Sequence, residues 1–211
     1  MDTEVVNEVR QWITEVHALM ARSIIAMEYP NGGKDAAPAE NNIAIPLGSI
    51  LLRNAYWTYA EPTRSGSHAK ERVDLIAANA SNAFVIEMKR RVKRFDGVLR
   101  DIRRLKEFEL QTAQPAANVL RVPSKFAQAK QKFGLFVATN FEEDESFAKG
   151  WVGLPRTETL KKKYKYVTEI ADLLPNEAIF DCTDACIGTT AFRDTGAFRL
   201  YWILFELSAS K

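Results

Sequence analysis

Apolar residues near the start of the chain recur every three or four positions, which is the spacing of one helix face. The repeat predicts an amphipathic helix over residues 3–28 that packs one face on the core. The segment 31–42 is rich in Gly, Pro, Ala and Asn and predicts a loop, and residues 45–59 predict a short second helix. The stripe of the first helix comprises Val5, Val9, Trp12, Val16 and Leu19, with Ile13 and Met20 beside it.

Two short apolar runs, residues 72–78 and 83–89, flank the sequence NASN. Asn and Ser favour turns, so the pattern predicts an antiparallel hairpin. The loop is expected at residues 79–82, which fixes the register of the two strands. Opposed residues in that register are Ala78 with Ala83, Asp74 with Glu87, and Arg72 with Lys89.

This register divides the hairpin into two faces, because side chains alternate across a strand. One face is entirely apolar and is expected against the core: Val73, Leu75, Ala77, Phe84, Ile86 and Met88. The other face is apolar only near the turn, at Ile76, Ala78, Ala83 and Val85. Its opposite end gathers three charged residues, Asp74, Glu87 and Lys89.

The rest of the chain alternates between helical and strand patterns. An apolar stripe at Val98, Leu99, Ile102, Leu105 and Phe108 predicts a helix over residues 97–111, with Arg100, Arg103, Arg104 and Glu107 largely outside the stripe. Residues 132–140 predict a central strand followed by an acidic loop, residues 160–174 another helix, and residues 178–207 two or three strands. The order indicates a mixed α/β or α+β fold, which we expect to form a single domain over residues 1–211.

Composition narrows the class of protein without identifying a partner. Of 211 residues, 46% are hydrophobic and 27% charged, as in ordinary globular proteins, and the formal net charge is only +2. The charge is unevenly distributed, since residues 89–106 contain nine basic and two acidic side chains. Cys182 and Cys186 are too few for a disulfide framework and poorly spaced for zinc. No segment has the pattern of a signal peptide or a membrane span, so we expect a cytoplasmic protein with no membrane partner.

The charged end of the hairpin is unusual because Asp74 and Glu87 are expected about 5 Å apart, where two carboxylates repel. A fold tolerates such a pair when a cation or a metal ion lies between the carboxylates, or when one of them takes up a proton. An oxygen-rich pocket of this kind suits Mg²⁺, which binds one or two carboxylates and keeps positions for water and phosphate oxygens. Lys89 lies one pleat from Glu87 and could stabilise charge on a phosphate. A plain surface ion pair between Glu87 and Lys89 is the structural alternative.

An Asp on one strand, a short hairpin, then Glu87-Met88-Lys89 and a following helix resemble the PD-(D/E)XK nuclease superfamily. The resemblance covers roughly residues 70–111, and Val73 replaces the Pro of the motif. It implies a restriction-endonuclease-like core with a central mixed β-sheet flanked by helices. It also implies that Asp74 and Glu87, with the Met88 carbonyl, bind Mg²⁺ or Mn²⁺, and that Lys89 assists an attacking water.

The same resemblance implies a nucleic-acid partner, DNA before RNA, and a homodimer if both strands are cut. The aromatic residues Tyr56, Trp57 and Tyr59 are either core or a platform for bases. Weaker accessory candidates are His68, Glu71, Glu15 and Glu28. Candidate phosphate contacts are Arg90, Arg91, Lys93, Arg94, Arg100, Arg103 and Arg104.

Two other classes of function remain open. The first is a nuclease-like protein that binds nucleic acid, or a partner protein, without cutting. The second is a small structural α/β protein whose hairpin charges are incidental. No separate DNA-recognition motif is visible, so in a restriction, repair, recombination or defence role we expect any sequence preference to come from loops of this domain or from a partner.

Overall fold

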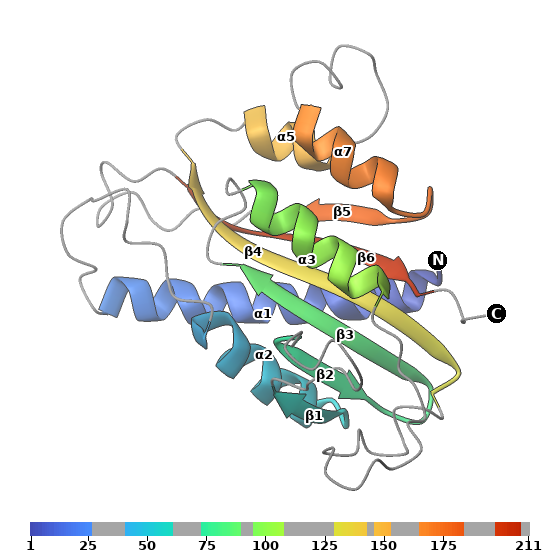
Figure 1. Cartoon of the computed structure of the whole chain (residues 1–211). Coiled ribbons are helices and arrows are strands. Elements are labelled where there is room, and N and C mark those ends of the chain that lie inside the picture. The colour runs from blue at the N-terminus through green and yellow to red at the C-terminus, as the bar shows by residue number, and fades with distance from the viewer. Residues whose placement is uncertain are drawn as a thin grey trace, which may run out of the picture.

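A computed structural model describes residues 1–26, 41–60, 73–89, 95–107, 129–142, 146–152, 165–183 and 197–207. Figure 1 shows a twisted β-sheet with helices around it. The helices are α1 (Thr3–Ala26), α2 (Asn41–Arg53), α3 (Phe95–Glu107), α5 (Ser146–Val152) and α7 (Lys165–Leu173). The strands are β1 (Trp57–Ala60), β2 (Leu75–Ala78), β3 (Asn82–Lys89), β4 (Gln131–Glu142), β5 (Ile179–Cys182) and β6 (Ala197–Glu206).

The six strands form one mixed sheet in the order β1-β2-β3-β4-β6-β5. The β3–β4 pair is parallel, and the other neighbouring strands pair antiparallel. Because a parallel neighbour requires a crossover, the chain leaves β3, forms α3 on one face of the sheet and returns to begin β4 beside the start of β3. The predicted mixed α/β class and the predicted central strand are therefore confirmed.

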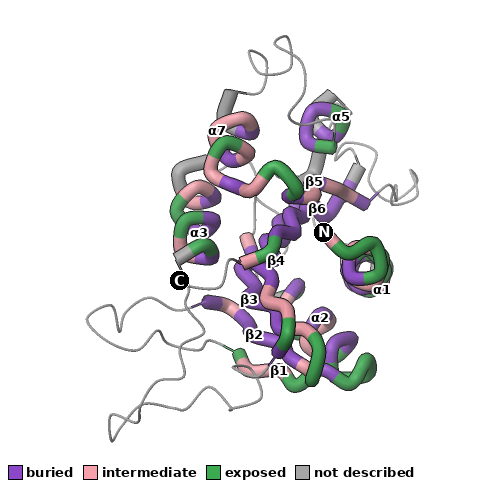
Figure 2. The backbone as a smooth tube through the Cα atoms, turned by 90° about the vertical axis from the view of Figure 1, so that its right-hand side faces the viewer, coloured by how far each residue is buried: buried purple, intermediate pink, exposed green. Residues whose placement is uncertain are grey.

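Helices cover both faces of the sheet (Figure 2). The apolar side chains of α1 and α2 pack with one sheet face in a cluster that includes Trp12, Ile43 and Phe84. Those of α3, α5 and α7 pack with the other face in a second cluster, around Phe136 and Trp151. The face of the hairpin that carries Glu87 and Lys89 is therefore covered by α3 rather than open to solvent.

The predicted first helix is present, and α1 spans Thr3–Ala26. Most of its predicted stripe is buried, but Leu19 is 41% exposed whereas the adjacent Met20 is 3% exposed. A stripe that follows Val9, Ile13, Val16 and Met20 keeps closer to the turn of a straight helix, so Leu19 falls outside the contact. Residues 27 and 28 lie outside the described residues.

Two elements, the edge strand β1 and the short helix α5, were not predicted. The second helix begins at Asn41, inside the predicted loop, and ends at Arg53, after which residues 57–60 form β1. Ala55 has a φ of 62° and reverses the chain between the two elements, a conformation that usually selects Gly. The short helix α5 begins at Ser146, at the end of the predicted acidic loop 142–147, and its buried Trp151 packs edge-to-face on Phe180 and Tyr201.

The predicted hairpin register is confirmed where the two strands pair. Ala78 lies opposite Ala83, and the pairing continues to Leu75 opposite Ile86. The Asn79 side chain closes the turn by accepting hydrogen bonds from the backbone N–H groups of Ser81 and Asn82. The predicted faces hold except at Val73, which packs with the α3-side cluster because the chain bends at Asp74 before β2 begins.

The remaining elements differ from the predictions mainly at their ends. The helix α3 begins two residues before Gly97, α7 begins at Lys165, and the C-terminal region forms β5 and β6. The segments 108–111, 160–164 and 184–196 lie outside the described residues. None of the described helices is long and apolar enough to cross a membrane.

His17 ties α1 to β6. Its ring stacks on Phe198 and its Nε2–H donates a 2.9 Å hydrogen bond to the Phe198 carbonyl. Burial lowers the pKa of His17 below its ordinary value of 6.5, although the hydrogen bond partly opposes this shift.

We therefore expect the stability of the fold to fall as the pH drops below about 6.5, because the unfolded chain takes up a proton that the folded His17 refuses. NMR titration of the ring protons measures this directly. His68→Gln assigns the two histidine signals, and a His17 signal that titrates at or above the ordinary value contradicts the expectation.

Gly134 lies at a close contact in the sheet. A Cβ added there would sit 2.8 Å from Cε1 of the Phe205 ring on β6. Gly134→Ala should therefore lower the free energy of unfolding by about 1–3 kcal/mol through overpacking. Gly48→Ala is the matched control, because no atom lies within 4 Å of its added Cβ, and it should stabilise α2 by about 0.5–1 kcal/mol. Urea unfolding of both variants checks the sign of each change.

Candidate functional site

The candidate site lies at the C-terminal end of β3, where α3 crosses the sheet. Glu87 and Lys89 leave β3 toward α3, and Asp74 immediately precedes the neighbouring strand β2. A Cβ on Gly97 would lie 3.4 Å from Cε of Lys89, so the start of α3 lies within van der Waals reach of the lysine. The sheet end and the helix together enclose the charged residues.

Glu87 is paired with an arginine from α3. Arg104 Nε donates to Glu87 Oε1 at 2.7 Å, and Arg104 Nη2 donates to Oε2 at 2.5 Å. This is the bidentate arrangement that a planar guanidinium makes with a carboxylate. Of the three ways to tolerate adjacent carboxylates, the structure therefore uses a cation from the protein itself.

The carboxyl of Glu87 is strongly perturbed. Burial raises the pKa of Glu87 to about 8, the hydrogen bonds from Arg104 pull this pKa down, and the negative charge of Asp74 pushes it up. A carboxyl whose pKa lies near neutrality is typical of functional sites, although ion-pair networks produce the same shift.

Asp101 links the two cations of the site. Its Oδ2 lies 2.7 Å from Lys89 Nζ, and its Oδ1 accepts a 3.0 Å hydrogen bond from Arg104 Nη2. Asp101 is fully buried, and it lies in the same turn of α3 as Arg104. One carboxylate of α3 thus holds Lys89 from β3 and Arg104 from its own helix.

Asp74 contacts the backbone of β3. Its Oδ2 accepts a 2.6 Å hydrogen bond from the Met88 N–H, between the two residues of interest on that strand. The paired residues of the hairpin end at Leu75 and Ile86, so Asp74 and Glu87 come next on their strands. The structure therefore brings Asp74 to Glu87, as the sequence predicts, and Arg72 lies outside the described residues.

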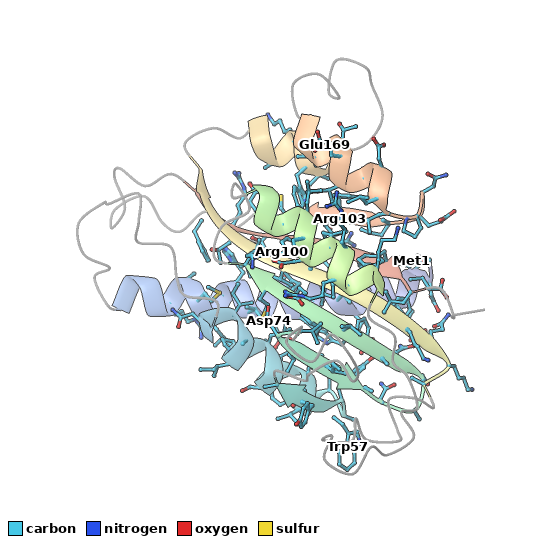
Figure 3. The ribbon with its side chains drawn as sticks, in the orientation of Figure 1. Met1, Trp57, Asp74, Arg100, Arg103 and Glu169 are labelled. Carbon is cyan, nitrogen blue, oxygen red and sulfur yellow. The ribbon has the colours of Figure 1, made fainter. Side chains whose placement is uncertain are left out.

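The charges of the site are arranged by sign. The side chains of Glu87 and Asp101 are 1% and 0% exposed, whereas those of Arg104 and Lys89 are 23% and 21% exposed. Arg100 and Arg103 lie exposed on α3, where Figure 3 labels them. Solvent therefore meets the cations first, which favours an anionic ligand such as a phosphate.

The donor set suits a hard divalent cation. Asp74 and Glu87 supply carboxylate oxygens, which Mg²⁺ prefers, and the guanidinium on Glu87 shows that a positive charge is already accommodated there. Within the described segments, no three His, Cys, Asp or Glu side chains lie close enough to hold a metal ion. A cation would therefore depend on two carboxylates, with backbone, water or ligand oxygens completing its shell.

The structure brings together Asp74, Glu87, Lys89 and the backbone of Met88, and it adds Asp101. Arg104 was expected among the phosphate contacts, largely outside the apolar stripe of α3, and its guanidinium lies on Glu87 and Asp101. Seven candidates lie outside the described residues, six near the hairpin and one from the predicted first helix: His68, Glu71, Arg90, Arg91, Lys93, Arg94 and Glu28.

Two other groups of candidates lie away from this end of the sheet. Glu15 is on α1, over the opposite face, and forms a 2.6 Å ion pair with Arg53. Tyr56 is buried, with Trp12 and Phe84 edge-on to its ring, so it belongs to the core. Trp57 is exposed on the edge strand β1.

Asp101 was missed as a site residue, although a signal was present. It occupies a position three residues after Val98 and four before Leu105, within the buried stripe of α3. An aspartate on the core face of a helix needs a cationic or hydrogen-bonding partner. The strand that packs beneath α3 supplies Lys89.

Comparison of the chain with protein-family models, with curated proteins and with solved structures gave no match. The geometry of the residues themselves therefore carries the functional argument.

Removing the charge of Asp101 should destabilise the fold. We expect Asp101→Asn to lower the free energy of unfolding by about 3 kcal/mol, because Lys89 and Arg104 lose a buried counter-charge. The matched control is Asp172→Asn, at an exposed position on α7, which should change it by less than about 0.5 kcal/mol. Equal unfolding midpoints for the two variants in urea would show that Asp101 does not anchor the cations.

Proposed function

We propose that the protein is a metal-dependent nuclease of the PD-(D/E)XK superfamily, with a restriction-endonuclease-like core and DNA as its substrate. The observation that carries the proposal is the convergence of Asp74, Glu87 and Lys89 at one end of a hairpin, directly before a helix. Two carboxylates and one lysine are the residue types that such a reaction needs.

The wider arrangement agrees with the resemblance. The hairpin of β2 and β3 belongs to a mixed sheet flanked by helices, and α3 follows β3 as the motif requires. Arg100 and Arg103 are exposed on α3, the helix whose Asp101 contacts Lys89, and they would meet a phosphate backbone that approaches this helix. Cutting of both strands would favour a homodimer with two such sites.

Each residue has a distinct role in the proposed reaction. Asp74 and Glu87, with the Met88 carbonyl, would hold Mg²⁺ or Mn²⁺, which when bound polarises a phosphate and lowers the pKa of a bound water. Lys89 orients the attacking water and stabilises the negative charge that develops on the phosphate. Asp101 holds the Lys89 ammonium at the end of β3 through its 2.7 Å contact.

A second candidate function is a nuclease-like protein that binds nucleic acid without cutting it. The observation that favours it is the double hydrogen bond from Arg104 to Glu87, because a guanidinium there supplies the positive charge that a metal would otherwise provide. The exposed arginines of α3 would serve binding in either case.

A cleavage assay separates the two functions. We expect the protein to cut plasmid or single-stranded DNA in Mg²⁺ or Mn²⁺, and to lose activity in EDTA. Lys89→Met and Asp74→Asn should each lower the rate at least about 100-fold, because each removes a group that acts on the reacting phosphate or water. RNA in a parallel reaction tests the preference for DNA.

Asp172→Asn is the matched control and should cut at the wild-type rate, since its carboxylate is exposed on α7. Thermal unfolding of every variant confirms that lost activity is not lost structure. Inert wild-type protein that still retards DNA in a gel would favour the second candidate, and cutting that survives Asp74→Asn and Lys89→Met would refute the proposed site.

A further inference from the structure

We propose that Arg104 is the resident counter-ion of the Glu87 carboxylate, and that a divalent cation binds to Glu87 and Asp74 only by displacing it from Glu87. This inference rests on the proposed metal site and concerns its regulation. In the arrangement described, Arg104 keeps the site weak for free metal ions. Its removal should make the same carboxylates a stronger metal site.

Arg104 occupies the Glu87 carboxylate that a metal ion would need. Arg104 donates to both carboxylate oxygens of Glu87, at 2.7 and 2.5 Å. A hard cation needs at least one of these oxygens at a shorter distance than a hydrogen bond allows. A guanidinium and a divalent ion on one carboxylate would also repel each other strongly in a site that excludes most water. The two cations therefore compete for Glu87.

A displaced Arg104 keeps a second counter-charge. Its Nη2 already contacts Asp101 Oδ1 at 3.0 Å, so it can leave Glu87 without losing every counter-charge. Its side chain is 23% exposed, which gives it an outward path on the solvent side of the site. A displaced Arg104 would carry donors that are then available to a phosphate of an arriving nucleic acid.

Among the neighbouring cations described, Arg104 is the one placed on Glu87. Lys89 lies beside Glu87 on β3, but its ammonium is placed on Asp101. Arg103 comes from the same turn of α3 and is exposed. Arg103 therefore reports what the loss of one arginine charge does to metal affinity from outside the network.

The test is a titration of the full chain with Mn²⁺ under argon, in which electron paramagnetic resonance measures the concentration of the free ion. A buffer near pH 8.5 limits competition from a proton on Glu87 in wild type; loss of Arg104 raises the pKa of Glu87 further, so any remaining proton competition works against the expected tightening. We expect Arg104→Gln to bind Mn²⁺ about tenfold or more tightly than wild type, which is the size of an ordinary coupling between two ligands. Arg103→Gln should stay within about twofold of wild type, as expected for a screened surface charge.

Arg104→Lys keeps the inference testable if Arg104→Gln folds poorly, because it retains the charge but loses the double hydrogen bond. It should bind Mn²⁺ with an affinity between those of wild type and Arg104→Gln. Thermal unfolding without metal verifies that each variant is folded.

Three outcomes overturn the inference, and they differ in what else they refute. If wild type, Arg104→Gln and Arg104→Lys bind Mn²⁺ equally and Glu87→Gln abolishes binding, the metal site stands and Arg104 does not compete for it. Equal tightening in Arg103→Gln and Arg104→Gln would indicate a general charge effect. If no variant binds Mn²⁺, or if Glu87→Gln binds as well as wild type, the proposed metal site itself is wrong.

Discussion

The burial of the Glu87 carboxylate sets the conditions for this end of the molecule. A carboxylate taken out of water is strongly unfavourable unless hydrogen-bonded cations surround it. Lys89 lies nearby on β3 but contacts Asp101, so the cation that pairs with Glu87 is Arg104 from α3. The helix is therefore placed by two demands at once: its apolar stripe must cover the sheet, and its polar residues must neutralise what the sheet buries.

These two demands divide the α3 side of the sheet into regions. Toward the hairpin turn, Ala83 and Val85 pack with the apolar residues of the helices. Toward the end of β3, the same row of side chains continues as Glu87 and Lys89, and α3 presents Asp101 and Arg104 to them. Because the opposite face is apolar along its length, the rigid core on the α1 side supports a charged site on the other.

The hairpin could be predicted from the sequence because its signals are local. The turn residues of NASN and the alternation of apolar side chains specify one register, and that register brings Asp74 toward Glu87. The partners on α3 could not be predicted in the same way, because they depend on how a helix docks after a chain reversal that no local pattern fixes. Asp101 lies in a basic stretch on the buried face of α3, and its particular partner, Lys89, follows from the docking of that helix on β3. Val73 was misplaced for a related reason, since strict alternation ignores the bend at Asp74.

The pairing also changes how the retained charges should be interpreted. Taken alone, two adjacent carboxylates suggest a metal ion, but Arg104 gives Glu87 a structural reason to persist without one. However, a buried ion pair is weak evidence for a stabilising role, because replacing such a pair by well-packed apolar residues is often neutral or stabilising. Four charges are nevertheless gathered over the end of one strand, with both carboxylates buried and both cations reaching solvent. The cations of this network lie on its solvent side, and we propose that the arrangement serves chemistry on a phosphate.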